Sequence, residues 1–209
     1  MNFGMVARIL GNLLLVEALL LAAPLLVSMA YGETAAVAFA WSLVITAAAG
    51  FALKLAKPRL DTIRAREGLL IVTLGWAAAA VFGALPFALT DCVPTFADAL
   101  FESASGLTTT GATIFNDVES LPRGMLFWRS FTHWLGGMGI LVFALALFPA
   151  IGVGGMQIYK AETPGPTADK LVPRLANTAK LLYTVYLGIT AAAVLALFAA
   201  GVPFFDAVL

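Results

Sequence analysis

One short polar string in this apolar chain has the residue types that bind a metal cation. It is Thr108-Thr109-Thr110-Gly111-Ala112-Thr113. Threonines offer carbonyl and hydroxyl oxygens, and rings of backbone carbonyls replace the hydration shell of a cation in channel filters. Gly111 has no Cβ and permits backbone angles that turn a carbonyl inward. The same string could be a polar turn between two amphipathic helices. The elements around it have to show whether it is a cation-binding loop or such a turn.

The composition indicates a membrane protein. Of 209 residues, 61% are apolar and 11% charged, whereas a soluble domain has about 45–50% apolar and about 25% charged residues. A larger core does not explain this excess, because a soluble domain must cover itself with polar surface. We therefore expect the lipid bilayer as a partner, and the balanced charge gives no reason to expect nucleic acid. The one cysteine, Cys92, excludes an internal disulfide and a cysteine-based metal cluster.

Five segments are long and apolar enough to span a membrane, which takes about 20 residues. Basic and non-basic connections alternate between them, so the positive-inside rule places the amino terminus in the cytoplasm. The acidic connection over residues 91–123 and the carboxyl end then face outward. The predicted spans are Ile9–Ala30, Thr34–Leu53, Leu69–Thr90, Arg123–Pro149 and Leu181–Gly201, and the basic connections carry Lys54, Lys57, Arg59, Arg64 and Arg66, then Lys160, Lys170, Arg174 and Lys180.

The connection between the third and fourth predicted spans contains a predicted half-length helix. It starts after Pro94, with Thr95 and Asp98 at the spacing of a capping box, and is expected to end near Gly106. Twelve residues make about 18 Å of helix, which is about half a bilayer. Irregular backbone at that depth is tolerated only where it is buried in protein or lines water. The negative end of the helix dipole points toward Thr108–Thr113, which favours a cation there.

A second copy of this arrangement begins near the end of the chain. Val93–Ala99 and Val202–Val208 share Val-Pro, Phe, Asp and Ala with one residue deleted, although chance could also produce seven similar residues. The period is about 109 residues for a unit of helix, pore helix, filter and helix. We therefore expect an amino-terminal hairpin over residues 1–56, a first repeat over 57–160 and an incomplete second repeat over 161–209, in the front part of a longer protein.

Ionisable residues within the predicted spans raise functional suspicion, because they are costly in lipid. Arg129 is expected to pair with an acidic residue near the pore mouth, such as Glu102, and to brace the loop. Glu17 and His133 are single, and a lone histidine is more often a hydrogen-bonded structural residue than a ligand or proton carrier. The outer acids could concentrate cations or simply be solvated; they are Asp91, Asp117 and Glu119.

Longer strings resemble the Trk/Ktr/HKT superfamily of potassium transporters, and specifically its TrkH-type subunits. The resemblance implies an all-α integral membrane fold that is potassium-channel-like. In it, four helix–pore loop–helix repeats surround one potassium pathway, preceded by a two-helix hairpin. The matching strings are Phe101–Thr113, Phe127–Ser130, His133–Gly139 and Ala161–Pro166, followed by Lys170, Pro173-Arg174 and Ala176–Lys180.

The resemblance also implies site residues and partners. In that family, the filter threonines and glycine of each repeat line the potassium site; here these are Thr109, Thr110 and Gly111, with Thr108 and Ala112 beside them. It implies K⁺ as the transported ion, no organic cofactor, a homodimer, a cytosolic TrkA-type nucleotide-binding regulatory subunit and a bacterial cytoplasmic membrane. Three of the four filter segments are absent from these 209 residues. A longer chain or several copies would therefore be needed to surround the ion.

Potassium uptake without covalent chemistry is the function that these observations favour. An intramembrane enzyme would need a pair of catalytic groups at one depth, but Glu17 and His133 are each single within their spans. A non-conducting membrane scaffold would leave both the capped half-helix and the threonine run unexplained.

Overall fold

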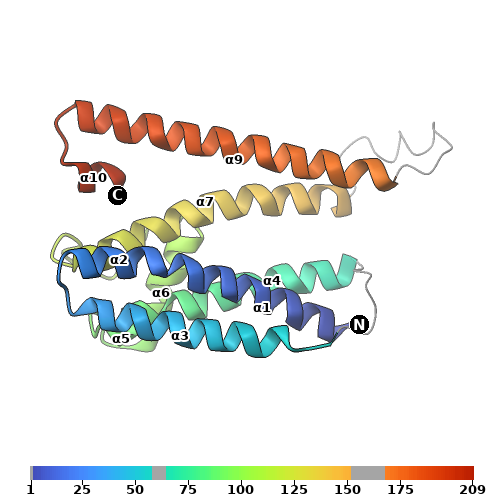
Figure 1. Cartoon of the computed structure of the whole chain (residues 1–209), viewed down its shortest axis with the longest axis horizontal. Coiled ribbons are helices and arrows are strands. Elements are labelled where there is room, and N and C mark those ends of the chain that lie inside the picture. Colours follow the sequence, from blue (N-terminus) through green and yellow to red (C-terminus); the bar gives the residue numbers. More distant parts are fainter. Residues whose placement is uncertain (1, 58–64, 152–167) are drawn as a thin grey trace. The chain divides into compact units, whose positions relative to one another are not determined.

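The computed structural model describes residues 2–57, 65–151 and 168–209, and in these ranges it consists of helices and the loops between them (Figure 1). The chain divides into two compact units, residues 1–134 and 135–209. The fold is that of an all-α integral membrane protein with a pore loop, as the sequence predicts. Several predicted features lie outside the described residues: Arg59, Arg64, Lys160 and the string Ala161–Pro166.

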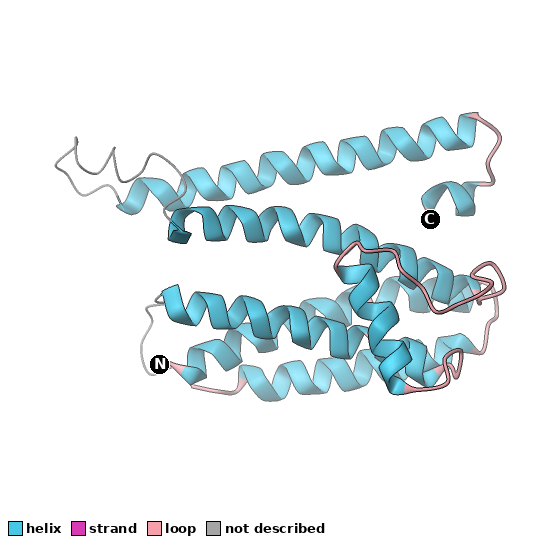
Figure 2. Cartoon of the chain, turned by 180° about the vertical axis from the view of Figure 1, so that it is seen from behind, coloured by secondary structure: helices cyan, strands magenta, loops and turns pink. Residues whose placement is uncertain are grey.

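The first unit holds an antiparallel hairpin followed by the pore segment. Figure 2 shows a short helix (residues 96–107) that runs at a steep angle to the long helices, with a loop returning from its end. The elements of this unit are α1 (Phe3–Leu20), α2 (Ala22–Ala30), α3 (Ala35–Lys54), α4 (Ala65–Gly83), α5 (Leu85–Leu89), α6 (Phe96–Leu107) and the first part of α7 (Arg123–Ile151).

Four helical stretches in the described residues are long and apolar enough to cross a membrane, and they coincide with four predicted spans. The remaining predicted span falls within α7, which has 29 residues. Two of the four contain a break that the prediction did not include, between α1 and α2 and between α4 and α5. Proline explains both breaks, because Pro24 and Pro86 cannot donate to the carbonyl four residues earlier. The four stretches are Phe3–Ala30, Ala35–Lys54, Arg66–Leu89 and Thr178–Ala199.

The two arms of the hairpin cross at a pair of glycines. A Cβ on Gly11 of α1 would lie 2.6 Å from the carbonyl oxygen of Gly50 and 2.6 Å from the backbone nitrogen of Lys54, both in α3. A Cβ on Gly50 would lie 2.9 Å from the carbonyl oxygen of Gly11. In lipid, helices associate through such close backbone contact, because burying apolar surface gains nothing there. The crossing therefore depends on both glycines.

The core of the first unit joins the hairpin to the pore segment. Phe39 of α3, Phe87 of α5 and Met125 of α7 are fully buried in one cluster. Trp128, which is 1% exposed, donates its indole N–H to the carbonyl of Gly83 at 3.0 Å. That carbonyl is available because α4 ends at Gly83. The start of α7 is therefore fixed against the hairpin and the pore helix together.

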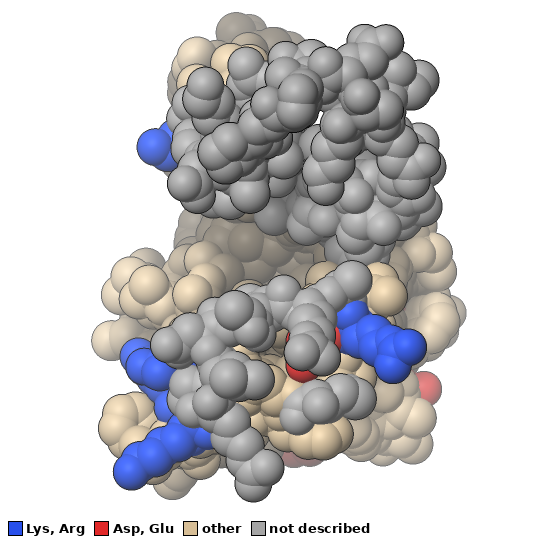
Figure 3. Space-filling view, turned by 90° about the vertical axis from the view of Figure 1, so that its right-hand side faces the viewer, with Lys and Arg blue, Asp and Glu red and all other residues tan. Residues whose placement is uncertain are grey.

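The two ends of this unit differ in charge. The backbone N–H of Asn2 donates to Oε1 of Glu67 at 3.0 Å, so α1 and α4 begin at the same end, where α3 finishes. Figure 3 looks onto this end and shows Lys and Arg side chains there. The segments at this end carry Arg8, Lys54, Lys57 and Arg66 against one acid, Glu67, and those at the opposite end carry Glu33, Asp91, Asp98, Asp117 and Glu119 against one base, Arg123.

The second unit contains the rest of α7, α9 (Ala168–Ala199) and α10 (Phe204–Val208). Helix α9 begins well before the predicted span at Leu181. The short α10 follows Pro203, and its Phe204 ring meets Phe198 edge to face, with centroids 6.1 Å apart. The second repeat stays a prediction, because only a five-residue helix follows Pro203.

Candidate functional site

The pore helix α6 starts with a threonine cap, as the sequence predicts. Oγ1 of Thr95 accepts the backbone N–H of Asp98 at 3.2 Å. The Thr95 hydroxyl also donates to the Asp98 carboxylate at 2.6 Å, in place of the backbone N–H of Thr95 that a full capping box would use. The helix has 12 residues and ends at Leu107, one residue beyond the predicted Gly106. The threonine run therefore begins at the residue after the last residue of the helix.

The backbone amides of the predicted filter turn back onto the end of α6. Thr110 and Gly111 both donate to the carbonyl of Ser105, at 2.9 and 3.5 Å, and Thr109 donates to the carbonyl of Gly106 at 2.8 Å. These bonds satisfy carbonyls that the last turn of a helix otherwise leaves unpaired.

The carbonyls of this loop differ in their hydrogen bonding. Thr109 and Gly111 have φ values of +57° and +76°, in the left-handed region that favours glycine. Within the described ranges, no group donates a hydrogen bond to the carbonyl oxygens of Thr108, Thr109, Thr110 or Gly111. The carbonyl of Ala112 differs, because it accepts the Ser105 hydroxyl at 2.6 Å. The geometry thus separates four available carbonyls from a fifth that anchors the loop.

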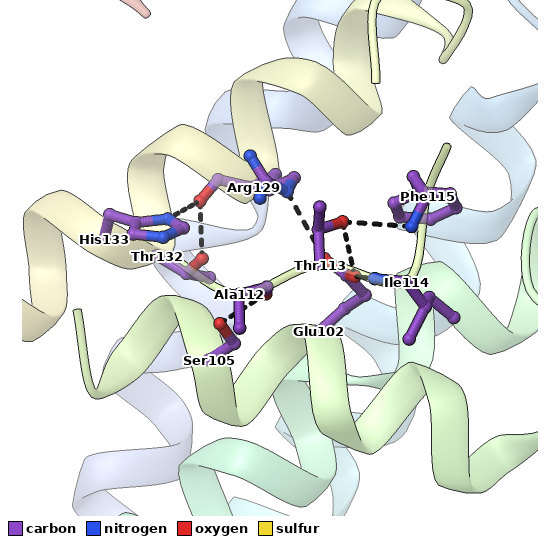
Figure 4. Close-up of polar contacts among 9 residues, drawn as sticks. All are labelled: Glu102, Ser105, Ala112, Thr113, Ile114, Phe115, Arg129, Thr132 and His133. Carbon is purple, nitrogen blue, oxygen red and sulfur yellow. Dashed lines mark hydrogen bonds and ion pairs between the residues drawn. The ribbon is translucent and has the colours of Figure 1, made fainter. Parts of the chain in front are cut away.

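A buried carboxylate holds the returning part of the loop. Glu102 of α6 is 1% exposed. Its Oε1 accepts both the Thr113 hydroxyl and the Ile114 backbone N–H at 2.7 Å, and its Oε2 lies 3.3 Å from Nε of Arg129 (Figure 4). The predicted pairing of Arg129 with Glu102 is confirmed. The guanidinium compensates a charge that would be very costly to bury alone.

Helix α7 packs two further side chains behind the loop. A Cβ on Gly106 would overlap Oγ1 of Thr132, so only glycine fits there. Nδ1 of His133 lies 2.8 Å from the Arg129 carbonyl; in a neutral ring this nitrogen carries the proton, because a carbonyl only accepts (Figure 4). A Cβ on Gly111 would lie 3.8 Å from Nε2 of His133, the other ring nitrogen. His133, predicted to be structural, therefore makes a structural hydrogen bond and borders the filter glycine.

Glu17 of α1 lies at the end of α4. A Cβ on Gly83 would lie 3.3 Å from Oε1 of Glu17 and 2.7 Å from Oγ of Ser103. Ser103 is fully buried, and its hydroxyl has no hydrogen-bond partner in the part of the chain that the structure describes. The carboxyl of Glu17 and this hydroxyl therefore both lie near Gly83 at the end of α4.

Cys92 is a packing residue rather than a reactive one. Its Sγ lies 2.8 Å from Oγ1 of Thr90, and the side chain is partly buried. Burial raises the pKa of the Cys92 thiol, which therefore stays protonated at neutral pH.

Two contacts that shape the site have no signal in the sequence. The bond between Ser105 and Ala112 requires the loop to fold back over α6, and Glu33 reaches α7 from 90 residues away. Glu33 appears in the sequence only as an acid in a short turn.

Helices long and apolar enough to span a membrane, together with a half-length helix that ends on a loop of carbonyls to which no described group donates, define a membrane protein with a pore loop. The TrkH family, described as cation transport protein, matches residues 35–208. The chain therefore belongs to the TrkH family.

Characterised relatives agree with this assignment. The chain is 44% identical over 211 residues to the Trk system potassium uptake protein TrkH of Salmonella typhimurium and 43% identical over 212 residues to that of Halomonas elongata, covering 100% and 99% of this chain. The crystal structure of the potassium transporter TrkH from Vibrio parahaemolyticus matches all of this chain and 42% of its own, with a TM-score of 0.85 and 37% identity. The chain spans 44% of the length of the two relatives.

Proposed function

We propose that this protein contributes one filter segment to a potassium uptake pathway across a bacterial cytoplasmic membrane. The observation that carries the proposal is the set of four carbonyl oxygens, from Thr108 to Gly111, to which no described group donates a hydrogen bond. Potassium named as the cargo of the similar TrkH proteins supports K⁺ as the ion. No covalent chemistry and no organic cofactor are needed for this activity.

In this mechanism, the loop replaces part of the hydration shell of K⁺ with backbone carbonyls. The carboxyl end of α6 adds a partial negative charge behind the loop. Glu102 and Arg129 hold the spacing of the carbonyls, because Glu102 binds the residues that follow the filter. A fixed spacing allows the loop to favour one cation over another.

The proposal includes the assembly that completes the site. Four equivalent segments around one ion would come from further repeats, within a homodimer controlled by a cytosolic TrkA-type nucleotide-binding subunit. Residues 108–114 are exposed, which supports an ion site that further filter segments complete by covering this loop. The basic end of the first unit supports an amino terminus in the cytoplasm.

Replacing Gly111 by alanine in the full-length protein tests the proposal. The φ of +76° at Gly111 makes any side chain strained. We expect rubidium uptake, or the ratio of rubidium to sodium uptake, to fall about tenfold, since such strain costs about 1–3 kcal/mol. Gly188→Ala is the matched control, because a Cβ there meets nothing within 4 Å. Unchanged rubidium uptake by the Gly111 variant, at equal protein in the membrane, would contradict the proposal.

A further inference from the structure

The outer turn of the hairpin caps the helix behind the filter. Glu33 lies between α2 and α3, and its Oε1 accepts the backbone N–H of Arg123 at 2.6 Å. Its Oε2 accepts the backbone N–H of Gly124 at 3.0 Å. These are the first amides of α7, which have no partner within the helix. A carboxylate there also meets the positive end of the helix dipole.

Neighbouring residues hold this cap in place. The Ser28 hydroxyl donates to Oε2 of Glu33 at 3.3 Å. Gly124 packs directly on Ser28, since a Cβ on Gly124 would overlap Oγ of Ser28. The Arg123 guanidinium lies 4.9 Å from the centre of the Tyr31 ring. The end of α2 and the turn after it therefore contact the start of α7 in three ways: through its backbone amides, through Gly124 and through the side chain of Arg123.

A short series of contacts leads from this cap to the filter loop. Arg129 lies six residues after Arg123, which is about 9 Å along a helix. It pairs with Glu102, and Glu102 in turn binds Thr113 and Ile114 at the end of the filter. A helix is stiff over such a distance, so a displacement of its first turn moves Arg129 as well.

We propose that Glu33 is a positioning residue for the pore loop: by capping α7, it sets the placement of Arg129 and thereby the spacing of the filter carbonyls. This inference rests on the proposed function, since it assigns the amino-terminal hairpin a part in ion selectivity. The competing explanation is that Glu33 only stabilises the fold. Trp128 also holds α7, through its bond to the carbonyl of Gly83, so the fold does not depend on Glu33 alone. Because both explanations predict some loss of stability, ion selectivity has to be measured to separate them.

The first experiment measures the ratio of rubidium to sodium uptake by the full-length protein carrying Glu33→Ala, Glu33→Gln or Glu119→Gln, at equal protein in the membrane. Alanine removes both bonds to the amides, whereas glutamine keeps one acceptor oxygen. Glu119 is an exposed acid at the same end, and its side chain bonds no helix start among the described residues, so Glu119→Gln controls for the loss of surface charge.

We expect the ratio of rubidium to sodium uptake to fall about fivefold in Glu33→Ala, because the first two amides of α7 lose their acceptor and Arg129 is displaced with the helix. The fall should be smaller in Glu33→Gln and absent in Glu119→Gln. A wild-type ratio in both Glu33 variants would show that Glu33 serves stability alone and would overturn the proposal. An equal fall in Glu119→Gln would also overturn it, in favour of general surface charge. If Glu33→Ala does not fold, Glu33→Gln carries the comparison.

A double-mutant cycle tests whether Glu33 acts through α7. Combining Glu33→Gln with Arg129→Lys should reduce the ratio by less than the product of the two single effects, because both act on one contact. Independent effects would refute transmission through Arg129. Gly111→Ala separates the two proposals. If Gly111→Ala transports rubidium like the wild type, the proposed function fails. If Gly111→Ala lowers rubidium uptake as expected but the Glu33 variants keep the wild-type ratio, only the role of Glu33 is overturned.

Discussion

Oε2 of Glu102 lies 3.3 Å from Nε of Arg129, and the other carboxylate oxygen of Glu102 holds Thr113 and Ile114. This pair links the pore helix, the end of the filter loop and α7 at one buried point. Arg129 is 17% exposed and Glu102 is 1% exposed, so water screens the pair only weakly. The pair is therefore both a structural bond and the brace of the loop.

Removing Arg129 should destabilise the protein more than removing both charges. Arg129→Gln leaves Glu102 buried without its partner, at a cost of about 3–5 kcal/mol. The double variant Glu102→Gln with Arg129→Gln should recover part of this loss, since no unpaired charge is left. Thermal unfolding of the purified full-length protein checks the order. A double variant less stable than Arg129→Gln would contradict this explanation.

Gly106→Ala should destabilise the pore segment, because the added methyl group would overlap Oγ1 of Thr132. Overpacking of this kind costs about 1–3 kcal/mol. Thr132→Ala removes the obstructing oxygen and should partly rescue the variant, whereas Thr132→Ser keeps the oxygen and should not. The melting temperatures of the three proteins measure the effect. Equal rescue by serine and alanine would exclude this contact as the cause.

Gly11→Ala should separate the two arms of the hairpin. Its Cβ would meet the backbone atoms of Gly50 and Lys54 at 2.6 Å, and backbone cannot move aside as a side chain end can. We expect a lower melting temperature and less protein in the membrane. Gly68→Ala in α4 is the control, because nothing lies within 4 Å of its Cβ. The close-crossing explanation would be wrong if both alanines behaved alike.

Impermeant maleimide labelling of intact cells checks the orientation. A cysteine in place of Asp117 should be labelled directly, since this exposed residue lies in the acidic connection that we place outside. A cysteine in place of Lys57, exposed at the basic end, should be labelled only after the membrane is permeabilised. The reverse pattern would invert the proposed topology.

Cys92 itself contributes little background to that measurement. Burial holds the pKa of its thiol above the ordinary value, and maleimide reacts with the thiolate. The thiolate fraction at neutral pH is therefore smaller than that of an exposed cysteine, and it rises as the pH increases. The engineered cysteines at exposed positions should react faster.

The spans, the pore helix and the acid–base pair could all be predicted from the amino-acid sequence. Spans follow from length and apolar composition, which act locally in lipid. The start of α6 follows from Thr95 and Asp98, which lie three residues apart and meet within one turn. The pairing of Arg129 with Glu102 was predictable although the two residues are 27 positions apart, because a charge within a membrane protein requires an opposite one.

Which faces of the helices meet could not be predicted, because it depends on how the helices pack in three dimensions. The contacts of Glu33 with α7, of Trp128 with Gly83 and of His133 beside Gly111 depend on how each helix is rotated and crossed. Hydrophobic periodicity does not predict that rotation here, because these helices carry apolar residues on the sides that face lipid as well as on the sides that face protein. Close packing at glycines and the need to satisfy buried polar groups select one arrangement. That arrangement gives the threonine run its backbone geometry.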